Sequence, residues 1–309
     1  MNLNYSNYEL ITTALLLAAG TGSRLYPLTQ NMPKCLTMVN ETSMLERLVI
    51  CLNKQGFKRL VVVTGYLGNC IREFLKTRAG GMTIDYIFSP LYKTTNNIYS
   101  LWMAREIINE PFLLIESDLV FDESLLDDMR YPDRIAIASR QAWMNGSTVT
   151  VDRSQQVKRF QIGITGPLDE IRYKTVNIYS FSLSSWHAIV ERLDRYISDG
   201  RVNYYYETVF AEMVADGSLC LQTVSFDAKP WYEIDTIADL AEAERLFPGD
   251  KLETKIPYSE TVTRSLSGSR AFPQSNSLFM KPIHDPNIKE NKVSPKEKSI
   301  RSVHGASEL

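Results

Sequence analysis

Histidine and cysteine are scarce in this chain. Three histidines occur among 309 residues, and two of them, His284 and His304, lie in the last part of the sequence. Acid/base catalysis by histidine is therefore not expected. The four cysteines show no Cys-x-x-Cys spacing, which argues against a zinc site and a disulfide framework and favours a reducing cytoplasm.

Long hydrophobic runs are also missing. The sequence holds no stretch of eighteen or more apolar residues, so it predicts no membrane span. Its start lacks the charged region and apolar core of a signal peptide. A net charge of −2 gives no reason to expect a nucleic-acid partner, which usually needs a basic patch. A hydrophobic content of 44% is ordinary for a soluble globular protein.

The composition changes at Pro248. Residues 249–309 are rich in Ser, Lys, Pro and Asn and lack a sustained hydrophobic period. We predict an N-terminal extension over residues 1–10, a folded domain over residues 11–248, and a disordered tail or linker over residues 249–309.

Apolar runs of strand length alternate with amphipathic helical segments in the first half. We expect strands at 13–17, 60–64, 84–88 and 112–115, and helices at 44–55, 67–76 and 98–107. This β-α-β-α-β order predicts an α/β fold with a doubly wound, mostly parallel, Rossmann-like central sheet. After about residue 134 we expect a mixed β extension. Its strands are predicted at 135–138, 148–151 and 175–181, with helices at 184–197, 205–215 and 237–246.

A glycine-rich turn directly follows the first predicted strand. Gly20 and Gly22 carry no Cβ, so the backbone can turn sharply and approach a ligand closely. The turn is neither the phosphate loop that ends in Gly-Lys-Ser/Thr nor the dinucleotide motif with its third Gly. Arg24 and Lys34 follow closely, and backbone N–H groups with two cations can neutralise phosphates. The pattern therefore favours nucleotidyl transfer.

Several motifs resemble a known family. Leu17-Ala18-Ala19-Gly20-Thr21-Gly22-Ser23-Arg24-Leu25-Tyr26-Pro27-Leu28-Thr29, followed by Pro33-Lys34-Cys35-Leu36, is similar to the signature of the sugar-1-phosphate nucleotidyltransferase superfamily. Further motifs resemble the phosphocholine and 2-aminoethylphosphonate cytidylyltransferases: Asn96-Asn97-Ile98-Tyr99-Ser100-Leu101, Glu116-Ser117-Asp118-Leu119, Tyr173-Lys174-Thr175-Val176-Asn177-Ile178-Tyr179 and Trp231-Tyr232-Glu233-Ile234-Asp235-Thr236. The resemblance covers about residues 11–247 and implies a nucleotidyltransferase (GT-A-like) architecture.

The resemblance implies roles for individual residues. Arg24 would hold the β- and γ-phosphates of the nucleotide, and Lys34 would contact the α-phosphate and the leaving pyrophosphate. Asp118 and Asp235 each follow a predicted strand, and the resemblance assigns both to a shared Mg²⁺, a cation that binds carboxylate and phosphate oxygens. The expected nucleotide contacts are Leu17, Ala18, Ala19, Gly20, Thr21, Gly22, Asn96, Asn97, Ser100 and Ser117.

The acceptor contacts are less specific in sequence. Lys174 is our candidate for the anionic end of the acceptor, and Asn177 lies on the same predicted strand. In a regular strand these two side chains point to opposite faces, so we do not expect both at one spot. For the amine of the acceptor, Glu207 is a candidate anion and Trp143 a candidate cation–π partner.

Together these features predict a Mg²⁺-dependent cytidylyltransferase that couples CTP to 2-aminoethylphosphonate, a small zwitterion, and releases pyrophosphate. Phosphocholine is the first alternative acceptor. A sugar-1-phosphate nucleotidyltransferase is the second alternative, although the Glu-Lys-Pro motif usual in those enzymes is missing between residues 140 and 235. A catalytically inactive nucleotide-sensing lobe is the third, and a homodimer stays open as the assembly.

Overall fold

The computed structural model describes residues 10–141, 144–163 and 171–248. Three predictions concern residues outside the described ranges. These are the N-terminal extension except for Leu10, the candidate Trp143, and the tail. None of the helices in the described ranges combines the length and apolar character needed to cross a membrane.

Four parallel strands form the centre of the sheet. Their spatial order is β6 (Met82–Phe88), β4 (Arg59–Thr64), β1 (Thr13–Ala18) and β7 (Phe112–Glu116). Strand β1 pairs in parallel with both β4 and β7, and β4 pairs in parallel with β6. The strand order therefore reverses between β1 and β7, which is where open α/β sheets bind ligands. The predicted doubly wound, mostly parallel centre is confirmed.

The second half extends this sheet with mostly antiparallel strands. Strand β12 (Tyr173–Phe181) pairs antiparallel with β7 and joins the two halves. It also pairs with β9 (Arg134–Ser139) and β10 (Thr148–Val151), which confirms the predicted mixed extension. Strands β11 (Val157–Gln161) and β13 (Gln222–Ser225) complete it.

The helices and short strands have the following bounds. The helices are α1 (Met44–Lys54), α2 (Gly68–Leu75), α3 (Asn97–Met103), α4 (Leu183–Ser198), α5 (Tyr206–Ala215) and α6 (Ile237–Leu246). The short strands are β2 (Met38–Val39), β3 (Thr42–Ser43), β5 (Arg78–Ala79), β8 (Leu119–Phe121) and β14 (Trp231–Glu233). Short 3₁₀ turns cover Ser23–Leu25, Lys34–Leu36, Ala104–Glu106, Glu123–Leu126 and Asp128–Arg130.

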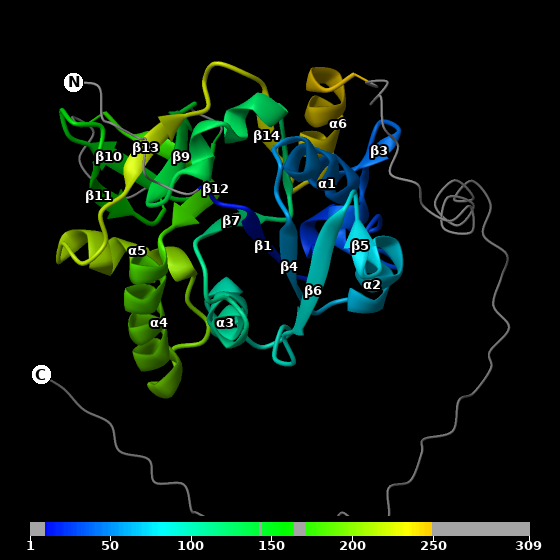
Figure 1. The fold of residues 1–309 in the computed structure, drawn as a ribbon. Coiled ribbons are helices and arrows are strands. Elements are labelled where there is room, and N and C mark those ends of the chain that lie inside the picture. The colour runs from blue at the N-terminus through cyan, green and yellow to red at the C-terminus, as the bar shows by residue number, and fades with distance from the viewer. Residues whose placement is uncertain (1–9, 142–143, 164–170, 249–309) are drawn as a thin grey trace, which may run out of the picture. The chain divides into compact units, whose positions relative to one another are not determined.

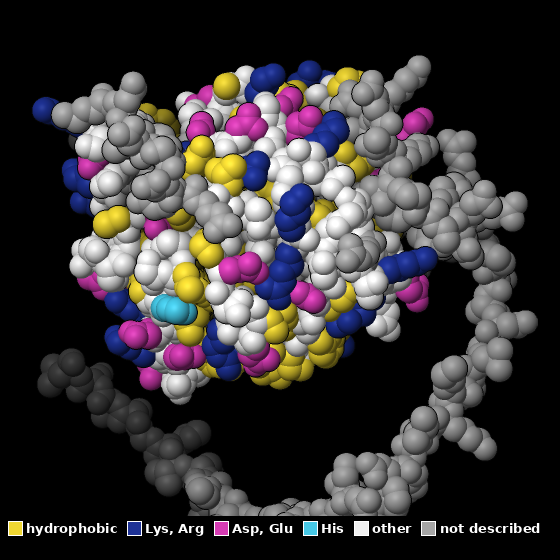
Figure 2. Space-filling model, viewed as in Figure 1, with side chains coloured by type: hydrophobic (Ala, Val, Ile, Leu, Met, Phe, Trp, Pro, Cys, Tyr) yellow, Lys and Arg dark blue, Asp and Glu magenta, His cyan; other side chains and the backbone are white. Residues whose placement is uncertain are grey.

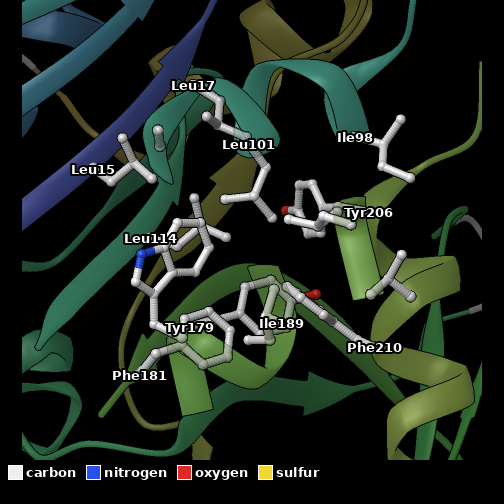
Figure 3. Close-up of a cluster of buried hydrophobic side chains, with 14 of the residues drawn as sticks. Leu15, Leu17, Ile98, Leu101, Leu114, Tyr179, Phe181, Ile189, Tyr206 and Phe210 are labelled. Carbon is white, nitrogen blue, oxygen red and sulfur yellow. The ribbon is translucent and has the colours of Figure 1, made fainter. Parts of the chain in front are cut away.

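Helices cover both faces of the sheet. Every residue of β1 is buried, so its alternating side chains must pack on two sides. Leu15 and Leu17 point into a cluster with residues of α3, α4 and α5, which lie together in the lower left of Figure 1. Figure 3 shows Leu101 of α3 and Tyr206 and Phe210 of α5 gathered in this cluster.

The segment that carries Asp235 is fixed by a second, smaller cluster. Strand β14 pairs with β8, the short strand directly after Asp118. Ile234 is fully buried in this cluster, which also contains residues of α6. Thr236 and Asp239 form a capping box at the start of α6. These contacts bring Asp235 beside Asp118 although the two are far apart in the sequence.

Candidate functional site

A cavity of about 280 Å³ lies at the carboxyl ends of β1 and β7. This is the position predicted from the strand order. Its lining includes most of the expected nucleotide contacts: Leu17, Ala18, Ala19, Gly20, Gly22, Asn96, Asn97, Ser100 and Ser117. Thr21 is not among the described residues that line it.

The glycine-rich turn lies against Lys34. Gly22 has a φ of 62°, a left-handed conformation that favours glycine. A Cβ on Gly22 would come within 2.8 Å of the Lys34 Cβ, so only glycine lets the two segments pack this closely. Around an ideal Cβ on Gly20, in contrast, no described atom lies within 4 Å. Gly20 therefore borders open space that a ligand can fill.

Two cations and two carboxylates meet at one end of this cavity. Lys34 Nζ donates to Asp118 Oδ2 at 2.8 Å and to Asp235 Oδ1 at 2.7 Å. Arg24 also pairs with Asp235 Oδ1, at 2.7 Å. Burial alone would lower the pKa of the Lys34 ammonium, but Asp118 and Asp235 outweigh it and raise the pKa above its usual value. These two contacts therefore favour the charged form of Lys34.

The two carboxylates fit a magnesium ion. Asp118 Oδ1 is buried and has no hydrogen-bond partner among the described residues. A buried carboxylate oxygen without a partner is costly unless a ligand satisfies it. No group of three or more His, Cys, Asp or Glu side chains gathers in a metal-binding arrangement within the described ranges. Two carboxylates suit Mg²⁺, which keeps several waters and takes its other ligands from phosphates.

A second cavity of about 510 Å³ adjoins the first. Both are lined by Arg24, Asn97, Glu116, Asp118, Tyr205 and Asp235. Three of the four expected acceptor contacts also line the second cavity: Lys174, Asn177 and Glu207. The two cavities therefore meet along a wall that carries Arg24, Asp118 and Asp235.

Our expectation that Lys174 and Asn177 point to different places is wrong. Asn177 has a φ of 59°, and the pairing of β12 with β9 shifts register between Thr175 and Tyr179. Strand β12 is therefore irregular at this point, so the strict alternation of side chains does not hold. Thr175 Oγ1 donates to Asn177 Oδ1 at 3.1 Å inside the irregular segment. Both Lys174 and Asn177 line the second cavity.

The second cavity carries charges of both signs. Lys174 is 3% exposed, and its Nζ lies 3.1 Å from Glu233 Oε2. Burial raises the pKa of Glu207 to about 7, although Lys174 acts in the opposite direction. Glu207 Oε2 is buried and has no hydrogen-bond partner among the described residues. Burial also raises the pKa of Glu233 despite its contact with Lys174.

Sequence reasoning missed several residues that line the second cavity. Glu116 and Glu233 lie in motifs that we recognised, but we assigned them no role. Glu233 precedes Asp235 by two positions at the end of a strand, a spacing that puts both on one side. That spacing could have identified Glu233. Tyr205 and Trp231 also line this cavity.

On the molecular face in Figure 2, acidic and basic side chains of the described residues are interspersed. Opposite charges gather instead in the two cavities, where they are close enough to act together on a small ligand.

The family model described as nucleotidyl transferase matches residues 13–161. This segment contains the glycine-rich turn, Arg24, Lys34 and Asp118. Over this segment the chain is similar to the nucleotidyltransferases. Its relatives place the similarity in the cytidylyltransferase branch.

Three curated relatives are named for cytidylyl chemistry. CMP-5'-(3-aminopropyl)phosphonate synthase of Streptomyces rubellomurinus is 28% identical over 79% of this chain, which spans 40% of that protein. The 2-aminoethylphosphonate cytidylyltransferase of Lancefieldella rimae is 28% identical over 74% of this chain and 91% of its own length. Choline-phosphate cytidylyltransferase of Streptococcus pneumoniae is 24% identical over 77% of this chain and 99% of its own length.

Solved structures share the fold. The CTP:phosphocholine cytidylyltransferase of Streptococcus pneumoniae has a TM-score of 0.63 at 21% identity, and the match covers 77% of this chain and 100% of that chain. A glucose-1-phosphate thymidylyltransferase from Bacillus anthracis has a TM-score of 0.64 at 18% identity over 79% of this chain and 100% of that one.

Proposed function

We propose that this protein is a Mg²⁺-dependent cytidylyltransferase that transfers CMP from CTP to a small aminoalkylphosphonate, with 2-aminoethylphosphonate as the preferred acceptor. The observation that carries the proposal is the junction of the two cavities. One cavity is lined by a glycine-rich turn suited to phosphates, and the other by a buried lysine and buried carboxylates. The charges suited to phosphoryl chemistry lie where the two cavities meet.

The reaction is an in-line displacement at the α-phosphorus of CTP. A phosphonate oxygen of the acceptor forms a bond to this phosphorus, and the bond to the pyrophosphate oxygen breaks. The attacking oxygen is already ionised near neutral pH, so no side chain has to remove a proton. Both reactants are anions, however, and their repulsion must be cancelled before they can meet.

Arg24 and Lys34 supply the fixed positive charge. Both lie in the wall of the first cavity, and Lys34 is held there by its two carboxylate partners. From this position Lys34 can donate to the α-phosphate, and Arg24 can neutralise charge on the leaving pyrophosphate. Asp118 and Asp235 would hold Mg²⁺, which when bound neutralises phosphate charge and orients the oxygens.

The second cavity is complementary to a zwitterion. Lys174 can bind the phosphonate, and Glu207 and Glu233 can bind the ammonium. A primary ammonium has N–H donors, and Glu207 Oε2 offers a buried acceptor that lacks a hydrogen-bond partner among the described residues. The two relatives that share 28% identity with this chain are named for aminoalkylphosphonates, which supports the same choice.

Phosphocholine is the second candidate acceptor because of two aromatic residues. Tyr205 and Trp231 line the second cavity, and aromatic rings attract a trimethylammonium group through cation–π contacts. The name of the pneumococcal relative agrees with this alternative. A trimethylammonium group has no N–H, however, so it would leave Glu207 without a hydrogen bond.

The two acceptors can be separated by steady-state kinetics. We expect kcat/KM for 2-aminoethylphosphonate to exceed that for phosphocholine by at least about a hundredfold. Lys174→Ala should lower both values alike, because both acceptors carry the anionic end. Glu207→Gln should lower the value for 2-aminoethylphosphonate most and should spare ethylphosphonate, which has no amine. Equal efficiency of the two acceptors would contradict the acceptor assignment and leave cytidylyl transfer intact.

A further inference from the structure

We propose that Asn97 is a positioning residue for the acceptor cavity rather than a reader of the cytosine base. This inference rests on the proposed function. Asn97 is the first residue of α3 and lines both cavities, at the point where the nucleotide side meets the acceptor side. Its neighbour Asn96 caps α3, because Asn96 Oδ1 accepts from the Asn97 N–H at 2.8 Å.

The side-chain amide of Asn97 already has partners inside the protein. Asn97 Nδ2 donates to Glu116 Oε1 at 3.1 Å, and Asn97 Oδ1 accepts from the Tyr206 N–H at 3.0 Å. The Asn97 amide also acts to lower the pKa of the Glu207 carboxyl. The side-chain oxygen and one N–H of the amide are therefore engaged inside the protein, which limits what Asn97 can offer to the edge of a base.

The bond from Tyr206 fixes the orientation of this amide. A backbone N–H can only donate, so the side-chain oxygen of Asn97 must face Tyr206 and the nitrogen must face the carboxylates. Tyr206 also donates its hydroxyl to Glu116 Oε1 at 2.8 Å. Asn97, Glu116 and Tyr206 therefore form a closed triangle of hydrogen bonds that joins α3, β7 and α5.

This triangle sets the position of the start of α5. Tyr205, the N-cap residue of α5, makes no side-chain capping hydrogen bond within the described part of the chain. Asn97 instead satisfies the first N–H of that helix from another element, the task that a cap residue normally performs. Tyr206 is fully buried, and its ring packs against Phe210 with centroids 5.1 Å apart (Figure 3).

The residues on either side of Tyr206 face the acceptor. Tyr205 and Glu207 both line the second cavity, and Tyr205 also lines the first. A shift at the start of α5 would therefore move the candidate ammonium ligand Glu207, while the glycine-rich turn and Lys34 belong to other elements. Loss of the Asn97 amide should weaken acceptor binding and leave the nucleotide contacts in place.

The test is a comparison of Michaelis constants in the full chain. For Asn97→Ala, which removes the hydrogen bonds to Glu116 and Tyr206, we expect the KM for 2-aminoethylphosphonate to rise about tenfold or more. The KM for CTP should change by less than about threefold, and the preference for CTP over UTP should persist. Tyr206→Phe keeps the backbone N–H and the ring but loses the hydroxyl, so it should raise the acceptor KM by a smaller factor.

Ser182→Ala is the matched control for a general loss of stability. Ser182 caps α4, where its Oγ accepts from the Ser185 N–H at 3.1 Å, and it is remote in sequence from the triangle. This variant should lower the melting temperature without raising the acceptor KM. Two outcomes would overturn the proposal. In the first, Asn97→Ala loses the preference for CTP over UTP while its acceptor KM is unchanged. In the second, Asn97→Ala and Ser182→Ala raise the acceptor KM by the same factor. Failure of the wild type to turn over CTP with any aminoalkylphosphonate would instead refute the proposed function.

Discussion

The two oxygens of the Asp118 carboxylate have different surroundings. One of its oxygens accepts from Lys34, and the other is buried without a hydrogen-bond partner among the described residues. We expect Asp118→Asn to reduce turnover by at least about a hundredfold, because it removes the negative charge that would hold the proposed magnesium ion. The measurement is pyrophosphate release as a function of Mg²⁺ concentration.

A nearby acid provides the control for this variant. Asp122 caps a 3₁₀ turn outside both cavities and accepts from the Ser124 N–H at 3.0 Å. Asp122→Asn keeps an oxygen in that position, so wild-type turnover is expected. If Asp118→Asn also kept wild-type turnover and Mg²⁺ dependence, the metal assignment would be wrong.

Glu207 gives the pH dependence of stability a definite sign. Burial raises its pKa from 4.5 to about 7, while Lys174 opposes the shift. Between these two pH values, the Glu207 carboxyl is therefore still protonated in the folded protein but already ionised in the unfolded chain. Stability should fall as pH rises from about 4.5 to about 7, and the full loss should be present above that range.

The Glu207→Gln variant isolates this contribution because glutamine does not titrate. Glu116 and Glu233 face the same cavity and titrate in both proteins, so their effect largely cancels in the difference. We expect the variant to gain stability relative to wild type as pH rises through this window. Urea denaturation at several pH values measures the difference, and a constant difference would show that Glu207 does not hold the proton.

At the scale of elements, the two glycines of the glycine-rich turn have different roles. Gly22 is needed for folding, and Gly20 leaves space for a ligand. Gly22→Ala introduces a Cβ at a φ of 62° and 2.8 Å from the Lys34 Cβ, so we expect the melting temperature to fall by about 3 °C or more. Gly20→Ala introduces a Cβ into open space, so the melting temperature should change by less than about 1 °C.

The same pair of variants should differ in nucleotide binding. Gly20→Ala should raise the KM for CTP about tenfold, because its methyl group occupies space that the phosphates need. Thermal unfolding and CTP kinetics of the two purified variants make the comparison. A destabilised Gly20→Ala protein, or one with an unchanged KM for CTP, would contradict this account of the turn.

The order of the main elements could be predicted from the sequence. Strands β1, β4 and β7 are continuous apolar runs, and α1 shows a clear helical period, so local pattern and final structure agree. Boundaries were less predictable. The helix expected at 98–107 ends at Met103 and continues as a 3₁₀ turn. The short strand β8 was missed, because its stability comes from pairing with β14.

In the site, too, residues within local motifs could be predicted, whereas contacts between distant segments could not. Arg24, Lys34, Asp118 and Asp235 lie in motifs, so sequence alone placed them together. The irregular segment of β12 could not be predicted, because alternation assumes a regular strand and Asn177 departs from it. The Asn97–Glu116–Tyr206 triangle depends on contacts between three elements that only the fold brings together.

At the scale of the whole molecule, the residues before position 249 form both hydrophobic clusters described above. The sequence of residues 249–309 lacks the apolar content that packing would need. We therefore expect a protein truncated after Pro248 to keep its melting temperature and its CTP turnover. An insoluble or inactive truncated protein would show that these residues complete the fold or an assembly.

The central claim is that the two adjoining cavities serve one reaction between CTP and an aminoalkylphosphonate. Its most direct test is pyrophosphate release by the full chain, with four nucleoside triphosphates each paired with 2-aminoethylphosphonate, 3-aminopropylphosphonate, phosphocholine and glucose-1-phosphate. We expect turnover with CTP and the aminoalkylphosphonates that exceeds every pairing with glucose-1-phosphate by at least about a hundredfold. Preferred turnover of glucose-1-phosphate, or no pyrophosphate release from CTP with any acceptor, would contradict the account.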